Sequence, residues 1–278
     1  MSLSLGFSPC PNDCFMFDAI VNQRIDLEGL DFSVRLADVE ALNQAAFAGD
    51  ADVTKLSYHA YAYCTGDYVL LDAGSALGRK CGPLLISKRA IAPEEVASGD
   101  LRIAIPGKFT TANFLLDLAF PSAQDKTPLL FSEIESALLE ERFDAGLIIH
   151  EGQLTFQNQG LSLVVDLGVW WQEKTGLPLP LGGNVVRRDL GADTIRQISR
   201  LLKESIRYSL DHRDAALAYA LQYARDMDKG LADRFVGMYV NDWTLDYGPR
   251  GREAVRRLLE EAHKAKVIPA PVSVEFVE

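Results

Sequence analysis

The sequence lacks the features of several large classes of protein. No stretch of its 278 residues holds about 18 uninterrupted apolar residues, so no transmembrane helix is expected. The opening MSLSLGFSPCPND has neither a basic region nor a long apolar run, so we read no secretory signal and expect a cytoplasmic protein. With 28 basic and 39 acidic residues the formal charge is −11, which disfavours nucleic acid and anionic membranes as partners.

Common cofactor and catalytic motifs are also missing. Neither G-x-G-x-x-G nor a Walker A pattern occurs, so no nicotinamide or nucleotide cofactor is expected. H-E-x-x-H, H-x-x-x-H and carboxylate clusters are absent, so we expect no metal, and the lack of G-x-S-x-G argues against an α/β-hydrolase. Of the four cysteines, Cys10 and Cys14 are spaced C-x3-C but no second pair matches them, which favours reduced thiols over disulfides or a zinc site.

Short apolar runs alternate with helical patterns, which indicates an α/β protein. Both halves show a strand, a proline-containing loop, a capped helix and a later strand that begins with aspartate. The repetition does not establish a duplication, because any α/β chain resembles it in outline. Expected strands are 3–7, 51–57, 68–72, 83–88, 101–105 and 143–149; expected helices are 13–21, 58–64, 112–120, 194–212, 214–225, 230–239 and 251–265, with two more after caps at Asp38 and Ser132.

The segment TGLPLPLGGNV suggests how the halves are connected. It could return the chain from the second half to the first, and the long helices that follow would then cover the first half. We therefore expect a larger, discontinuous α/β domain of residues 1–89 plus 182–278 and a smaller inserted α/β domain of residues 90–181. Two such lobes would enclose a central cleft, with ligands bound outside the carboxyl ends of the strands.

The first helix of each lobe offers an N-terminus, where unpaired backbone N–H groups and a partial positive charge attract anions. Thr110 and Thr111 add hydroxyl groups at the second of these sites, and a carboxylate would fit there. The two threonines could equally be ordinary helix caps. Asn12 and Asp13 at the first site, and Asn184 in the glycine-rich segment, are further candidates for substrate contacts.

Two strand ends supply the remaining candidates. The strand DVTKLS ends at Lys55, Leu56 and Ser57, and the strand DAGLII ends at His150. Lys55 and Ser57 can donate hydrogen bonds to a ligand, and Leu56 offers its backbone amide. An imidazole, with a usual pKa of about 6.5, suits general base catalysis. A lone histidine at a strand end is more often structural, so the residues alone leave its role open.

Several segments together resemble one family. GFSPCPNDCFMFDA, TKLSYHAY, IPGKFTTANFLL, IIHEGQLTF, LPLPLGGN and MYVNDWTLDYGPRG occur in this order and span essentially the whole chain. They are similar to the 1,4-dihydroxy-6-naphthoate synthases of the futalosine route to menaquinone. The combination of SPCPND with IIHEGQ is the specific part. Cys14 departs from the pattern, because threonine is more common there.

The resemblance implies a two-lobed fold of the type II periplasmic-binding-protein kind. It implies a cofactor-independent carbon–carbon lyase that cleaves cyclic dehypoxanthinylfutalosine to 1,4-dihydroxy-6-naphthoate and dihydroxyacetone. The partner would be this small anionic aromatic substrate. His150 would be the proton acceptor, and residues 55–57 with Thr110 and Thr111 would contact the substrate.

Two alternatives would share the fold. A solute-binding protein would have the same anion-binding helix starts, but the N-terminus shows neither an export signal nor a lipoprotein cysteine. Chorismate dehydratase of the same pathway is the second alternative. The SPCPND and HEGQ segments favour the naphthoate synthases.

Overall fold

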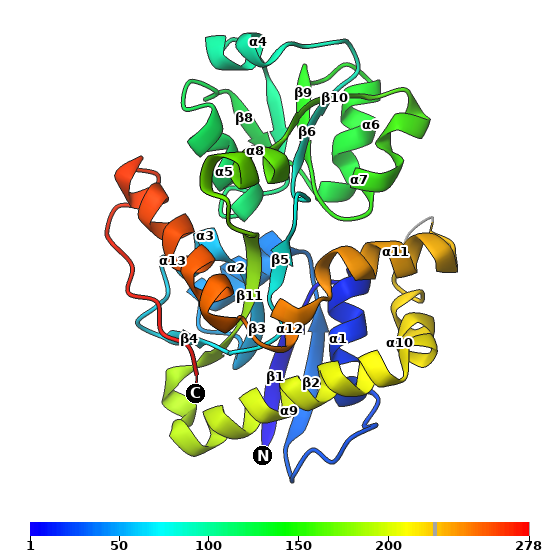
Figure 1. The fold of residues 1–278 in the computed structure, drawn as a ribbon, viewed down its shortest axis with the longest axis vertical. Coiled ribbons are helices and arrows are strands. Elements are labelled where there is room, and N and C mark those ends of the chain that lie inside the picture. Colours follow the sequence, from blue (N-terminus) through cyan, green and yellow to red (C-terminus); the bar gives the residue numbers. More distant parts are fainter. Residues whose placement is uncertain (225–226, 278) are drawn as a thin grey trace.

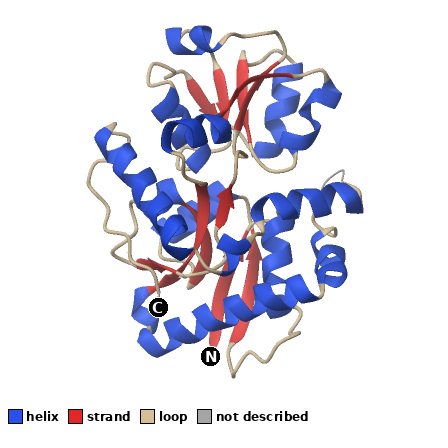
Figure 2. Cartoon of the chain, in the orientation of Figure 1, coloured by secondary structure: helices blue, strands red, loops and turns tan. Residues whose placement is uncertain are grey.

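The computed structural model describes residues 1–224 and 227–277, which form two α/β lobes, one above the other in Figure 1. Each lobe has a β-sheet with helices packed around it, as Figure 2 shows. Residues 79–83 and 176–178 cross between the lobes. No helix in the described part of the chain is long and apolar enough to span a bilayer.

The lower lobe contains a mixed sheet with the order β2-β1-β3-β11-β4, and β5 pairs with β11. β1 pairs in parallel with β2 and β3, whereas β11 runs antiparallel to β3, β4 and β5. The strands are β1 (Ser2–Phe7), β2 (Asp31–Leu36), β3 (Val53–Ser57), β4 (Tyr68–Leu70), β5 (Ala76–Gly78) and β11 (Leu179–Arg187).

The upper lobe contains a second sheet with the order β10-β6-β9-β7-β8. β7 pairs in parallel with β8 and β9, so the carboxyl ends of these strands lie on one edge. The strands are β6 (Leu84–Ser87), β7 (Ile103–Ile105), β8 (Lys126–Pro128), β9 (Ala145–Ile148) and β10 (Ser162–Asp166).

The sheets divide the chain a few residues away from the expected domain boundaries. β6 precedes residue 90 but belongs to the upper sheet, where it pairs with β9 and β10. β11 begins before residue 182 and belongs to the lower sheet. Boundaries at 89 and 182 are therefore wrong as limits of the two sheets, because the chain crosses between the lobes earlier in both places.

Helices of the C-terminal third cover the lower sheet, as their placement in the sequence suggested. Long helix α9 is amphipathic, and its apolar side chains recur every three or four residues, which puts Ile198, Leu202 and Ile206 on one buried face. That face packs on α1 and the lower sheet in one hydrophobic core. The lower-lobe helices are α1 (Pro11–Val21), α2 (Val39–Phe47), α3 (Tyr58–Tyr61), α9 (Ala192–Asp211), α10 (Arg213–Ala220), α11 (Lys229–Tyr239), α12 (Asp242–Leu245) and α13 (Gly248–Lys264).

The upper sheet has shorter helices on its faces. Their apolar residues join the strands in a core that includes Leu85, Phe114 and Trp171. The helices are α4 (Pro93–Ser98), α5 (Thr111–Ala119), α6 (Ile134–Leu139), α7 (Gly152–Thr155) and α8 (Leu167–Thr175); 3-10 turns occupy Phe131–Glu133, Phe156–Gln159 and, in the lower lobe, Arg188–Leu190.

Several helix and strand ends differ from the expectation. Helix α1 begins at Pro11, two residues before the expected start, with Cys10 as its N-cap, because proline suits the first helical position. Ser132 lies in a 3-10 turn and does not cap α6. Asp38 does cap α2, as expected. The end of the helix expected at 214–225 lies outside the described residues, and α10 ends at Ala220.

Candidate active site

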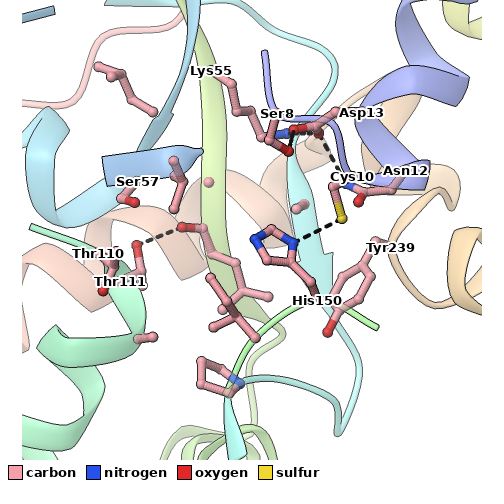
Figure 3. A pocket seen from close by; sticks show the side chains of 18 of the residues that line it. Ser8, Cys10, Asn12, Asp13, Lys55, Ser57, Thr110, Thr111, His150 and Tyr239 are labelled. Carbon is pink, nitrogen blue, oxygen red and sulfur yellow. Dashed lines mark hydrogen bonds and ion pairs between the residues drawn. The ribbon is translucent and has the colours of Figure 1, made fainter. Parts of the chain in front are cut away.

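A pocket lies between the lobes, where the carboxyl ends of β1, β3, β7 and β9 meet (Figure 3). The space that no atom occupies is about 650 Å³, including the part open to solvent. Most candidate residues line it: Asn12, Asp13, Lys55, Leu56, Ser57, Thr110, Thr111 and His150. Asn184 is not in the lining; it is fully buried in β11, where its Nδ2 donates to the Gly74 carbonyl oxygen at 3.0 Å.

A buried ion pair forms one wall of the pocket. The Lys55 Nζ lies 3.0 Å from the Asp13 Oδ1, and their side chains are only 6% and 3% exposed. Asp13 also accepts hydrogen bonds from the Ser8 hydroxyl at 2.7 Å and from the Asn12 amide at 3.0 Å. Lys55 donates to the Gly74 carbonyl at 3.1 Å, and an ammonium group has one more N–H to offer to a ligand.

Ser57 is held by a buried asparagine. The Asn43 Oδ1 accepts the Ser57 backbone N–H at 3.1 Å, and its Nδ2 donates to the Ser57 Oγ at 3.3 Å. The Ser57 hydroxyl proton can therefore point into the pocket. The Asn43 Nδ2 also reaches the Phe109 carbonyl at 3.3 Å, so the same side chain links the lower lobe to the upper lobe.

The hydroxyl groups of Thr110 and Thr111 are both hydrogen-bonded within the protein. The Thr110 hydroxyl donates to the Gly107 carbonyl at 2.8 Å and accepts the Asn113 N–H, which makes Thr110 the N-cap of α5. The Thr111 hydroxyl donates to the Leu181 carbonyl at 2.6 Å and accepts the Tyr58 N–H at 3.0 Å. Both bonds of Thr111 cross between lobes. At this helix start, the groups left for an anion are the backbone N–H groups of Thr111 and Ala112.

His150 follows β9 and has left-handed backbone geometry, with φ of 63°. Its Nδ1 lies 2.9 Å from the Cys10 Sγ, and the Phe131 ring packs against the imidazole at 4.4 Å between centroids. The Nε2 is buried without a hydrogen-bond partner among the described residues. Burial lowers the pKa of His150 below its usual value, while the charges of Glu151, Asp13 and Asp38 oppose the shift. The imidazole is thus a neutral base near neutral pH.

Three residues that line the pocket with His150 were not among the candidates chosen from the sequence: Cys10, Gln153 and Tyr239. Cys10 touches the imidazole from the other lobe, and the Tyr239 hydroxyl donates to the Gln153 Oε1 at 2.9 Å, also across the cleft. These contacts join positions 86 and 140 residues apart, so no local motif could have revealed them. The available signal was the family resemblance of the segments SPCPND and IIHEGQ, which contain Cys10 and Gln153.

Cys10, His150 and Glu151 form a cluster that the sequence did not predict. The Cys10 Sγ, a ring nitrogen of His150 and a carboxylate oxygen of Glu151 lie within 4.8 Å of one another, and these residue types can bind Zn²⁺. Two ligands on a tetrahedral zinc would lie about 3.5 Å apart, judged from usual Zn–S and Zn–N lengths. The 2.9 Å contact is shorter, so the geometry is that of a hydrogen bond.

The chain is similar to known enzymes over nearly its whole length. A family model described as menaquinone biosynthesis matches residues 3–264. A 1,4-dihydroxy-6-naphthoate synthase of Thermus thermophilus is 43% identical over 272 residues, covering 97% of both chains. Another, of Streptomyces coelicolor, is 38% identical over 281 residues, covering 97% of this chain and 95% of that one. This chain belongs to that family. It is an enzyme of menaquinone biosynthesis and a lyase, and the resemblance read from the sequence is confirmed.

Solved structures confirm the expected fold. A protein of Archaeoglobus fulgidus superposes with a TM-score of 0.89 at 39% identity, covering 96% of this chain and 98% of that one. The alkanesulfonate-binding protein of Xanthomonas axonopodis pv. citri superposes with a TM-score of 0.72 at 12% identity, covering 98% and 96%. The second similarity concerns the fold alone. The chain therefore has the two-lobed fold of periplasmic binding proteins.

Proposed function

We propose that this enzyme cleaves cyclic dehypoxanthinylfutalosine to 1,4-dihydroxy-6-naphthoate and dihydroxyacetone, with His150 as the general base. The names of the relatives support the product. One observation carries the role of the histidine: its Nε2 is buried at a pocket between two lobes, with no partner among the described residues. A base needs such a nitrogen, within reach of the proton that it removes.

The substrate carboxylate would bind at the start of α5. Thr111 and Ala112 lie in the first helical turn, whose N–H groups have no acceptor within the helix, and both line the pocket. The Ser57 hydroxyl would add a donor from the lower lobe. In this pose the aromatic ring lies against Leu181 and Ile149, and the sugar-derived ring lies toward His150 and Lys55.

The reaction would begin when the His150 Nε2 takes the proton of a hydroxyl on the sugar-derived ring. The oxygen then forms a carbonyl group, the adjacent carbon–carbon bond breaks, and its electron pair moves into the bicyclic ring, which becomes aromatic. The remaining N–H of Lys55 and the Ser57 hydroxyl would stabilise the negative charge that develops. Lobe closure would align these groups and exclude water.

Two substrates, cyclic dehypoxanthinylfutalosine and chorismate, separate this function from its alternatives. Purified enzyme is incubated with cyclic dehypoxanthinylfutalosine, and the two products are measured by chromatography and mass spectrometry. We expect stoichiometric formation of both products. A solute-binding protein would release the ligand unchanged, and a chorismate dehydratase would consume chorismate instead. Either result would contradict the proposal. The cytoplasmic location expected from the sequence stays a prediction.

A further inference from the structure

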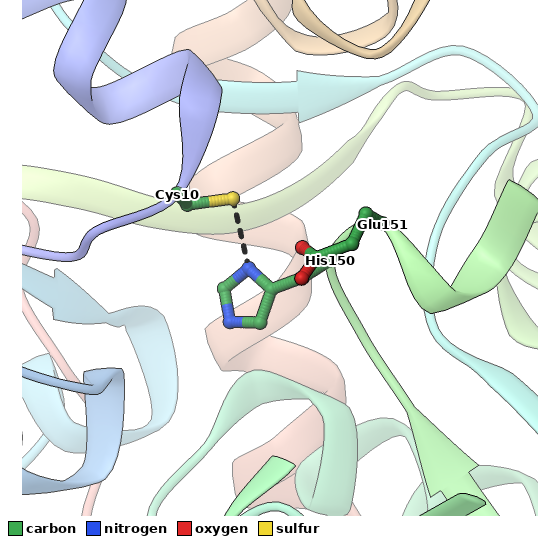
Figure 4. A group of neighbouring side chains, drawn as sticks. All are labelled: Cys10, His150 and Glu151. Carbon is green, nitrogen blue, oxygen red and sulfur yellow. Dashed lines mark hydrogen bonds between the residues drawn. The ribbon is translucent and has the colours of Figure 1, made fainter. Parts of the chain in front are cut away.

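The contact between Cys10 and His150 joins the two lobes at the centre of the pocket. Cys10 is the N-cap of α1 in the lower lobe, and His150 stands between β9 and α7 in the upper lobe. Figure 4 shows the thiol directed at the Nδ1 of the ring, and the two atoms are 2.9 Å apart. The Phe131 ring of the upper lobe packs against the same imidazole. The lower lobe thus contacts the edge of the ring that carries Nδ1.

Both partners are neutral in this setting. Burial raises the pKa of the Cys10 thiol well above its usual value, and the charges of Glu151 and Asp13 raise it further. Burial also lowers the pKa of His150. A thiolate–imidazolium pair, which a cysteine nucleophile would need, is therefore disfavoured. The thiol is suited to a hydrogen bond and not to attack on the substrate.

The two ring nitrogens have different surroundings. Nδ1 faces the sulfur, whereas Nε2 has no partner among residues 1–224 and 227–277. For Nε2 to accept a proton, the single proton of the neutral ring must be on Nδ1, with the sulfur as its acceptor. A thiol is a weak hydrogen-bond donor, so an S–H group without a good acceptor costs little free energy.

We propose that Cys10 is a positioning residue, whose sulfur accepts the Nδ1–H of His150 and thereby keeps the lone pair of Nε2 directed at the substrate. Because the two residues belong to different lobes, the base is oriented only when the cleft is closed. Substrate binding and activation of the base are thus coupled. This inference rests on the proposed function of His150, and it leaves the thiol chemically unchanged through the reaction.

The test uses Cys10→Ala and Cys10→Ser, with Cys64→Ala as the matched control. Cys64 is an equally buried thiol of the lower lobe, bonded to backbone carbonyls and outside the pocket lining. We expect Cys10→Ala to lower kcat roughly 10- to 100-fold, the effect that loss of an orienting partner has on metal-bound histidines, with little change in KM. Cys10→Ser should recover part of kcat, and Cys64→Ala should match wild type. Wild-type kcat in Cys10→Ala would overturn the proposal.

A second measurement does not depend on turnover. The chain has only four histidines, so ¹⁵N-labelled imidazoles can be resolved by NMR, with His150 identified from its missing signals in His150→Asn. In wild type bound to product, we expect the Nδ1–H tautomer at His150, and a shift toward Nε2–H in Cys10→Ala. An Nε2–H tautomer in wild type would contradict the inference. If the wild-type enzyme forms no product, the proposed function fails, while the NMR result still decides whether Cys10 sets the tautomer.

Discussion

The Asp13–Lys55 pair gives the most quantitative prediction for stability. Asp13→Asn removes the negative charge but keeps the size of the side chain, and it leaves the Lys55 ammonium buried beside a neutral amide. Removing one partner of a buried ion pair costs roughly 3–5 kcal/mol, because the remaining charge is neither solvated nor paired. For a chain of this size that corresponds to a fall in Tm of roughly 6–20 °C, at about 2–4 °C per kcal/mol.

Thermal and urea unfolding followed by circular dichroism would measure this loss. The matched control is Asp214→Asn, which breaks a pair of similar length with Lys229 on the surface, and we expect it to unfold like wild type because exposed pairs contribute little. Adding Lys55→Met to Asp13→Asn should restore part of the loss, since the unpaired cation is gone. The reasoning is refuted if Asp13→Asn is as stable as Asp214→Asn, or if the second change only adds a further loss.

Two further predictions concern the pocket. Since burial lowers the pKa of His150, the acidic limb of the kcat/KM profile should have its midpoint below pH 6.5. Glu151→Gln should move this midpoint lower still, because the Glu151 charge raises the pKa of His150. A midpoint above pH 6.5 in wild type, or an upward shift in Glu151→Gln, would contradict the assignment of His150 as the base. Thr111→Val leaves the buried Tyr58 N–H without its acceptor and removes two bonds between lobes, so we expect about 1–3 kcal/mol lower stability by urea unfolding and a higher KM. Thr111→Ser keeps the hydroxyl and should behave like wild type, whereas an unchanged KM in Thr111→Val would show that these bonds do not support closure.

The parts of the fold that local patterns determine were predictable. The strand that ends near His150 is an apolar run, the strand VTKLS ends at Ser57 as expected, and the Asp38 cap follows a standard signal. β2 was missed although its DFSVRL alternates polar and apolar residues, because it is an edge strand with mostly exposed side chains. The crossings between the lobes were misplaced because β6 and β11 pair with strands distant in sequence.

The site was predictable where strand ends and helix starts define it, which covers residues 55–57, Thr110 and His150. Its internal contacts were not, because they depend on how the lobes meet. Asp13 was read as a substrate contact, but its carboxylate is already occupied by Lys55, Ser8 and Asn12. Asn184 was chosen from the glycine-rich segment that returns the chain to the lower lobe; in β11 its amide donates a hydrogen bond to the Gly74 carbonyl oxygen.

The central claim is that His150 removes the proton that starts cleavage, and His150→Asn tests it most directly. Asparagine tolerates the left-handed backbone that this position has, so the variant should fold and keep the pocket. Calorimetry with 1,4-dihydroxy-6-naphthoate would show whether product affinity is retained. We predict affinity near that of wild type with kcat lowered roughly 10²-fold or more. Near-normal turnover in a variant that binds product normally would contradict the account.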